Sequence, residues 1–270
     1  MQQYLAENDL ELETLSDLFD IPSPRPPHVK ASRFPSVPDF YFTEWQEQCE
    51  ISYLKTAAAV LNSVIMLYRE YFPFIDTSSL FVINNHPEHK EPMKVYDKNI
   101  IFLTASTSCW AQFIYQFAHE FCHYVIAKRV DKRMRWFEEA LCELSSQFFL
   151  TKSAEKWKEQ PPYSDSEWRR YASSIQDYVD SILNTAISFP ILDLSNPSSD
   201  ILKSLEKDEY QRELNCAFAV HLLPHFIESP SLWQIVYYLP ELSDSNTFLE
   251  NLYLLQDLSG QPIENIISSL

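Results

Sequence analysis

Glycine is nearly absent from this chain, whose 270 residues include only Gly260. Tight β-hairpins and left-handed helix caps usually contain glycine, because glycine adopts positive φ angles without steric cost. A chain with so little glycine should favour helices joined by loops rich in proline, asparagine, aspartate and serine. The seventeen prolines agree with this expectation, and a hydrophobic content of 46% indicates a globular protein with a substantial core.

Basic residues are also scarce, with 21 lysines and arginines against 38 acidic residues and a net charge of −17. Such a chain repels a nucleic-acid backbone and an anionic membrane surface, so we expect neither as a partner. No apolar run has the roughly 20 residues of a membrane-spanning helix. The longest run, Ala57 to Leu67, contains Asn62 and Ser63. The acidic N-terminus lacks the basic start of a secretory signal peptide.

The cysteines form no disulfide framework, because there are five of them at irregular spacing. Reduced, buried thiols are typical of a reducing compartment, which predicts a cytoplasmic protein. Cys122 and Cys142 fall inside the two motif segments described below and could in principle bind metal. We interpret them as small apolar core residues, the usual state of a free cysteine.

One stretch points to chemistry: residues His119 to His123 read H-E-x-x-H. On a helix, histidines four residues apart project from one face, so two imidazoles can hold one zinc ion. The adjacent Glu120 is then free to act as a base. The flanks favour a helix, because apolar residues recur every three or four positions. This stripe comprises Trp110, Phe113, Ile114, Phe117, Phe121, Tyr124 and Val125.

The two histidines lie roughly opposite the apolar stripe, in line with Gln112 and Gln116, and should face a cleft or solvent. A catalytic zinc site needs a third protein ligand and leaves a fourth position to water. A second helical pattern from Trp136 onward supplies candidates, since Glu139 and Glu143 share a face. One carboxylate would bind metal, and the other would accept the free N–H of a ligating histidine.

These two stretches, His119 to His123 and Trp136 to Cys142, together resemble the gluzincin peptidases, the group of thermolysin and the aminopeptidase N-like enzymes. In that group H-E-x-x-H precedes a helix of the type W-x-N-E-G-x-A. The resemblance covers about residues 115–150. It implies a predominantly helical α+β fold, the zincin-like metallopeptidase domain, with a small β-sheet before the motif helix.

The resemblance also implies roles for single residues. Zinc would bind His119, His123 and Glu139, and Glu143 would match the acid that supports a ligating histidine in thermolysin-like members. Glu120 would take a proton from zinc-activated water as the water attacks a peptide bond. Because Glu138 is adjacent, the carboxylate ligand stays open among three glutamates, with Glu139 favoured by register and Glu138 expected in solvent.

The sequence departs from the gluzincin pattern at two helix positions, where Glu138 and Ala140 replace the usual asparagine and glycine. The spacer of fifteen residues between His123 and Glu139 is short. The same residues fit the ImmA/IrrE-like peptidases, whose ligand helix reads E-A-x-x-F-A. The L-M-P ending of that helix is replaced by Leu150-Thr151-Lys152.

Gluzincins place a tyrosine or histidine in a later helix to stabilise the oxyanion. Tyr210 and His221 are eleven residues apart, close to three turns, and share a face. Because the family tyrosine often opens such a helix, the resemblance favours Tyr210. His221 stays an alternative, and the weaker candidates are Tyr163, Tyr171, Tyr178 and His225.

The sequence therefore predicts a zinc metallopeptidase acting on a peptide or protein substrate. One alternative is an ImmA/IrrE-like regulatory protease with a single protein substrate. Another is a non-catalytic zincin-fold binding protein, in which a purely structural zinc site would not need Glu120.

In this interpretation residues 1–40 form an acidic, proline-rich N-terminal arm and residues 41–270 the metallopeptidase domain. Residues 1–20 favour a short amphipathic helix, and the prolines that follow favour extended chain, as a strap or an inhibitory segment. A long helix is expected from Phe42 to Tyr71. Strands are expected at Leu80–Ile83, Lys94–Tyr96 and Asn99–Leu103, and later helices at about 164–187, 207–223, 230–238 and 245–257.

The resemblance implies that the last of these strands, within Asn99 to Ser106, lines the substrate cleft. Between the motif helices lies a basic cluster of five residues, which we interpret as partners for the abundant acids. The alternative is a rim that attracts acidic groups of a substrate. The cluster comprises Lys128, Arg129, Lys132, Arg133 and Arg135.

Overall fold

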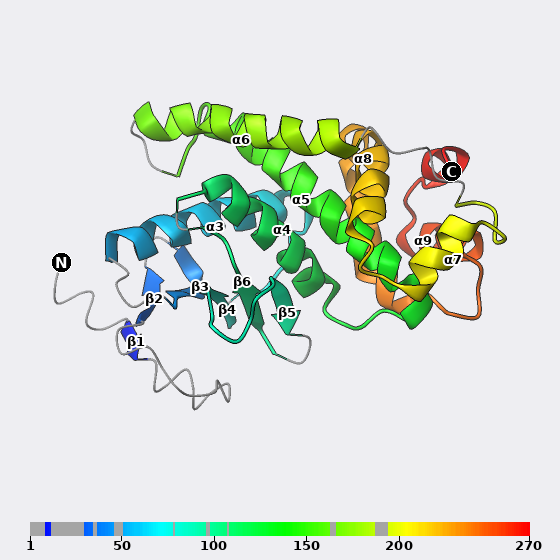
Figure 1. Cartoon of the computed structure of the whole chain (residues 1–270), viewed down its shortest axis with the longest axis horizontal. Coiled ribbons are helices and arrows are strands. Elements are labelled where there is room, and N and C mark those ends of the chain that lie inside the picture. The colour runs from blue at the N-terminus through cyan, green and yellow to red at the C-terminus, as the bar shows by residue number, and fades with distance from the viewer. Residues whose placement is uncertain are drawn as a thin grey trace.

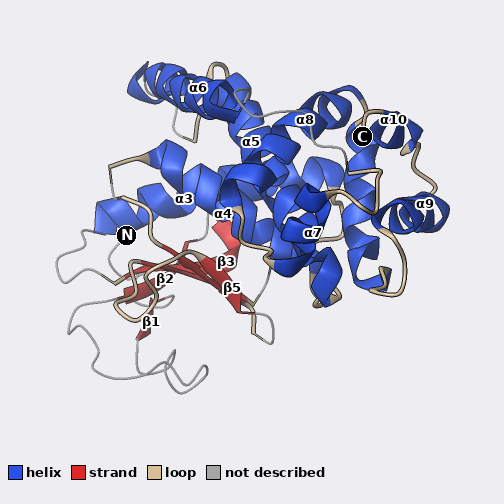
Figure 2. Ribbon diagram, turned by 45° about the vertical axis from the view of Figure 1, so that its right-hand side comes forward, coloured by secondary structure: helices blue, strands red, loops and turns tan. Residues whose placement is uncertain are grey.

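The fold is α+β and mostly helical, with helices packed against one face of a six-stranded sheet (Figures 1 and 2). This is a computed structural model. It describes residues 9–11, 30–34, 37–45, 51–77, 79–95, 98–106, 108–162, 166–186 and 194–270.

The sheet has the strand order β1-β2-β3-β4-β6-β5. β3, β4 and β6 run parallel to one another, whereas β1, β2 and β5 pair antiparallel with their neighbours. β5 therefore lies at an edge of the sheet, beside β6. The strands are β1 (Asp9–Glu11), β2 (Lys30–Phe34), β3 (Val37–Glu44), β4 (Leu80–Asn84), β5 (Met93–Val95) and β6 (Ile100–Leu103).

Two long central helices, α4 and α5, carry the motif residues, and further helices surround them. None of the helices in the described ranges combines the length and apolar character needed to cross a bilayer. The helices are α3 (Ile51–Tyr71), α4 (Trp110–Ile126), α5 (Arg135–Trp157), α6 (Ser166–Ala186), α7 (Asp200–Lys207), α8 (Arg212–Glu228), α9 (Phe248–Ser259) and α10 (Glu264–Ser268). Two 3₁₀ segments are η1 (Lys132–Met134) and η2 (Pro230–Glu241).

The predicted strands at β4, β5 and β6 are confirmed. β5 pairs antiparallel with β6. The long helix expected from Phe42 is wrong at its start, since α3 begins at Ile51 and residues up to Glu44 belong to β3. The side chains of this segment alternate between the two faces of the sheet, which explains why it is a strand. Phe42 enters the main core, while Tyr41 stacks on Phe81 on the other face.

The start of the chain also differs from the sequence prediction. Asp9–Glu11 is a strand where an amphipathic helix was expected, and most of residues 1–20 lies outside the described residues. β2 and β3 are extended, as the prolines predicted. β3 runs across position 40 and pairs with β4. A separate role for residues 1–40 stays a prediction.

The later helical region differs from the prediction in its bounds and in one helix type. The helix expected over 207–223 is α8, which starts only at Arg212 and runs to Glu228, and α7, which ends at Lys207 before the extended Asp208, was not predicted. The segment near 230–238 is the 3₁₀ helix η2, which contains two prolines.

α3, α4 and α5 meet through polar contacts inside the core. The Tyr68 hydroxyl of α3 donates to the Ala118 carbonyl of α4 at 2.6 Å and contacts the Ser145 hydroxyl of α5. Ser145 donates to the same carbonyl at 2.9 Å, and Ser146 donates to the Tyr115 carbonyl at 3.0 Å. Because serine is small, α5 lies close to α4, and these bonds fix the position of one helix along the other.

Positive φ angles are rare among the described residues. Gly260 ends α9 in the left-handed conformation with φ of 66°. This is the usual conformation of a glycine at the end of a helix, and Gly260 is the one glycine of the sequence. Asn85 and Ala127 also have positive φ, of 57° and 64°. Ala127 follows the last residue of α4, and its N–H donates to the His123 carbonyl.

Candidate metal centre

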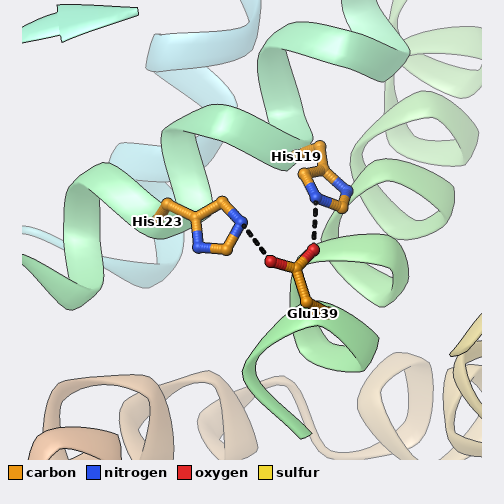
Figure 3. A group of neighbouring side chains, drawn as sticks. All are labelled: His119, His123 and Glu139. Carbon is orange, nitrogen blue, oxygen red and sulfur yellow. Dashed lines mark hydrogen bonds and ion pairs between the residues drawn. The ribbon is translucent and has the colours of Figure 1, made fainter. Parts of the chain in front are cut away.

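His119, His123 and Glu139 converge between α4 and α5 (Figure 3). One ligand atom from each lies within 4.8 Å of the others. The Nε2 atoms of His119 and His123 face the two oxygens of Glu139, at 3.3 and 3.5 Å. Two imidazoles and one carboxylate thus surround a single point, and this group could hold a metal ion.

The outer nitrogens of both histidines also face carboxylates. His123 Nδ1 lies 2.8 Å from Oε1 of Glu138, and His119 Nδ1 lies 3.7 Å from Oε2 of Glu143. Each carboxylate can accept the Nδ1–H and so direct the lone pair of Nε2 toward the central point. The expectation that Glu138 lies in solvent is wrong, because its side chain is 2% exposed and bonds to His123.

Glu143 belongs to a longer chain of contacts. The Tyr115 hydroxyl donates to Oε1 of Glu143. Arg212, the first residue of α8, in turn hydrogen-bonds to the side chain of Tyr115. Burial and the neighbouring Glu143 carboxylate hold the pKa of Tyr115 well above its usual value, so Tyr115 stays a donor. His119 is therefore positioned by groups from three helices.

The metal-free centre favours positive charge. Burial alone lowers the pKa of His119, but hydrogen bonds to Glu139 and Glu143 raise it to about 10. Burial likewise opposes the charge on His123, whose carboxylate partners hold its pKa well above normal. Burial raises the pKa of Glu139 and Glu143, yet the histidines bring both below the ordinary value. A divalent cation satisfies the same requirement for positive charge.

Glu120 lies beside this centre without joining it. Its carboxylate is buried and lies near the backbone N–H of Lys94 in the edge strand β5, which favours its charged form. Burial raises its pKa, and the charges of His119 and His123 reduce that effect. A buried carboxylate with a raised pKa, next to a potential metal site, has the properties of a general base.

A cavity of about 700 Å³ opens over the three convergent residues. Its lining includes the segment from Glu91 to Lys94, which leads into β5, and Tyr210, Arg212 and Asn215 at the start of α8. The prediction that β6 lines the cleft is wrong, because none of the residues of β6 lines the cavity. β6 is paired on both sides, with β4 and β5, so neither of its edges is free for a substrate. From the predicted stretch, only Thr104 lines the cavity among the described residues.

The structure separates the candidate oxyanion donors. Tyr210 lines the cavity with its side chain 73% exposed, just before α8. His221 points elsewhere, with Nε2 3.0 Å from the Ser269 hydroxyl, and Tyr171 accepts from the backbone N–H of Trp110. Tyr163 lies outside the described residues. Neither Tyr178 nor His225 lines the cavity.

The thiols and the basic cluster take structural roles. Cys122 and Cys142 are free and fully buried between α4 and α5, as the sequence indicated. Arg133 pairs with Glu206 at 2.7 Å, and Arg135 pairs with Glu209 at 3.6 Å. Arg129 is the member of the cluster that lines the cavity.

Sequence reasoning missed Tyr115, Arg212, Asn215 and the contact of Glu138 with His123. Tyr115 is four residues before His119, so the helical period places both on one side, and this signal was available. The other contacts depend on how α5 and α8 pack against α4, which no local pattern records. No model of a known protein family matches this chain, and no curated protein matches it.

Proposed function

We propose that this protein is a zinc-dependent metallopeptidase of zincin type. The observation that carries the proposal is the convergence of both Nε2 atoms on Glu139, with a carboxylate behind each histidine. Two histidines and a glutamate form the ligand set of catalytic zinc sites that keep one position open. The neutral tautomers that zinc needs are supported by Glu138 and Glu143.

Zinc bound at this centre supplies a Lewis acid that polarises a peptide carbonyl and lowers the pKa of a water molecule to about 7. The remaining steps belong to residues of the chain. Glu120 takes the water proton on its carboxylate and passes it to the leaving amide nitrogen. Tyr210 offers its hydroxyl to the negative oxygen that develops on the carbonyl carbon.

The proximity of Glu120 to the backbone of Lys94, with both residues lining the cavity, supports this assignment. It places the proposed base between the metal centre and the edge strand β5. An extended peptide that lies along a sheet edge presents its carbonyl groups at regular spacing. The base would therefore face the position where a scissile bond lies when a substrate occupies the cavity.

Two other functions remain as alternatives. A regulatory protease with one protein substrate would use the same centre and differ only in selectivity. A non-catalytic zinc protein is disfavoured by Glu120, because burying a fourth carboxylate near the centre costs free energy that a structural site need not spend.

The test is Glu120→Gln, which keeps the size of the side chain but cannot accept a proton. We expect unchanged zinc content by elemental analysis and a loss of about 10²- to 10⁴-fold in peptide cleavage, measured by mass spectrometry on a peptide library. Glu159→Gln, at an exposed position after α5, is the matched control and should behave as the parent. Equal cleavage by Glu120→Gln and the parent would remove Glu120 from the mechanism. Absence of zinc from the parent, also after reconstitution, would overturn the proposal.

A further inference from the structure

The part of the cavity lining that α8 provides carries polar groups that the proposed hydrolysis does not use. Arg212 and Asn215 both line the cavity from the first turn of α8. Residues three apart on a helix lie on the same side, so the two side chains act on the same region of the cleft. One is a cation and the other offers a neutral acceptor.

Arg212 differs from the other cations near the centre in what it binds. Arg133 and Arg135 form ion pairs with Glu206 and Glu209, and the Lys94 ammonium donates to the Val95 and Lys98 carbonyls at 2.6 and 2.9 Å. Within the described part of the chain, Arg212 makes no ion pair within 4 Å.

The guanidinium of Arg212 has capacity for a ligand. Its hydrogen bond to Tyr115 uses part of a group with five N–H donors. The side chain is exposed, and it lies at the edge of the cavity. A carboxylate is the partner that fits the planar fork of a guanidinium, through two parallel hydrogen bonds.

Asn215 supplies a second, independent observation. Its residue is 5% exposed, and its Nδ2 donates to the Glu209 carbonyl at 2.7 Å. Its Oδ1 is buried, and among the described residues this atom has no hydrogen-bond partner. A buried acceptor without a partner costs free energy. A backbone N–H of a bound peptide would satisfy it.

We propose that Arg212 binds a carboxylate of the substrate while Asn215 accepts a neighbouring backbone N–H, so that the cleft selects acidic peptides. This inference rests on the proposed peptidase function and specifies its substrate class. The carboxylate has two sources, an aspartate or glutamate side chain or the C-terminal carboxylate of a peptide. The first source is compatible with cleavage inside a chain, and the second with removal of C-terminal residues.

Binding to the zinc-loaded Glu120→Gln variant tests the inference without cleavage. The probes are alanine tetrapeptides that carry one aspartate, asparagine or lysine, each with a C-terminal carboxylate or amide, measured by calorimetry. We expect a preference of about ten- to a hundredfold for a carboxylate over its amide counterpart, the effect of a hydrogen-bonded charge. Preference for aspartate over asparagine identifies the side chain as the source. Preference for the free C-terminus over its amide identifies the terminus.

Substitutions in the same background assign the preference to Arg212. Arg212→Gln should abolish it, Arg212→Lys should retain part of it, and Arg212→Glu should reverse it toward lysine peptides. Arg169→Gln, at an exposed position on α6, is the matched control and should leave the preference unchanged. Because each result is a ratio within one variant, a general loss of stability does not imitate it. Zinc content is measured for every variant, so that a loss of the metal is told apart from a loss of the Arg212 side chain.

Three results would overturn the inference. These are no preference in the parent background, no binding of any acidic probe at millimolar concentration, and an undiminished preference in Arg212→Gln, which would assign the carboxylate to the zinc or to Arg129, the other arginine that lines the cavity. Cleavage without acid preference would leave the proposed function standing and refute only the role of Arg212. Conversely, the protein could show an Arg212-dependent preference while it holds no zinc and cleaves no peptide. That result would refute the proposed peptidase function and support the proposed carboxylate-binding site.

Discussion

The two motif helices differ in their surroundings. α4 buries an apolar stripe that includes Phe113, Phe117 and Phe121, and its opposite side carries the histidines. α5 packs against α3, α4, α6 and α8, so nearly all its sides are buried. An apolar period predicts orientation only where the opposite side is polar and borders water or, as on α4, a cavity. On α5, a polar residue is a sign of a specific partner rather than of solvent.

The buried carboxylates of α5 follow this rule. Glu138 and Glu143 are each nearly inaccessible, and each meets a histidine of α4. Glu139, between them in sequence, is more exposed and faces both histidines at the cavity. Three glutamates on one helix therefore occupy three environments, and substitutions at them can test whether these environments determine their roles.

The largest effect is expected for Glu139→Ala, which removes the carboxylate that both Nε2 atoms face. Zinc affinity should fall by more than the about ten- to hundredfold typical of residues that only support a ligand. Competition with a chelator measures this directly. Glu155→Ala, an exposed glutamate of the same helix, is the control and should bind zinc as the parent does. A smaller loss for Glu139→Ala than for Glu138→Ala or Glu143→Ala would assign the ligand to another glutamate.

Intermediate effects are expected for Glu138→Ala and Glu143→Ala. Each should cost about ten- to a hundredfold in zinc affinity, because a ligating histidine loses the acceptor for its Nδ1–H. Glu138→Ala should cost more, since its oxygen lies 2.8 Å from His123, against 3.7 Å between Glu143 and His119. The same competition assay ranks the two. A silent Glu138→Ala would mean that α5 does not use its buried carboxylates in the way its packing indicates.

The smallest change per step is a pH dependence of zinc affinity, about tenfold for one pH unit and one histidine. Zinc needs neutral histidine, and carboxylate hydrogen bonds overcome burial to raise the pKa of His119 to about 10 in the metal-free protein. Below that pH zinc must displace a proton, so affinity should fall as pH falls. From pH 9 to pH 7 we expect a loss of about tenfold per unit for each protonated histidine. An ordinary histidine, with a pKa of about 6.5, would give constant affinity over this range. Constant affinity would thus show that the carboxylates do not hold protons on the histidines.

The sequence predicted those parts of the fold in which apolar residues recur with a regular local period. The stripe on α4, the strands β4, β5 and β6, and the helical second half all follow from the spacing of apolar residues. It failed for β3, where alternation of Phe40, Tyr41 and Phe42 competed with a helical pattern further on. Short apolar runs fit strand and helix alike, and the neighbouring strand decides between them.

In the candidate site, too, the contacts that follow from local spacing were predictable and those that depend on helix packing were not. The spacing of four residues on one helix was sufficient to predict that His119 lies beside His123. The register of the second stretch predicted that Glu139 lies near both histidines. The partners of Glu138 were not predictable, because they depend on how closely Ser145 and Ser146 let α5 approach α4. The position of Arg212 in the cavity was not predictable either, because it depends on helix packing and α8 is more than fifty residues from either motif.

Ala127 shows what the shortage of glycine costs the chain. It sits at φ of 64° directly after the motif helix, a conformation that a β-carbon disfavours by roughly 1–2 kcal/mol. Ala127→Gly should remove this strain, and after the greater flexibility of unfolded glycine is subtracted, it should stabilise the protein by about 1 kcal/mol or less. Thermal unfolding of the variant and the parent measures the gain, and a lower melting temperature for the variant would contradict it. The chain would then be one in which composition, more than contacts, limits heat resistance beside the cleft.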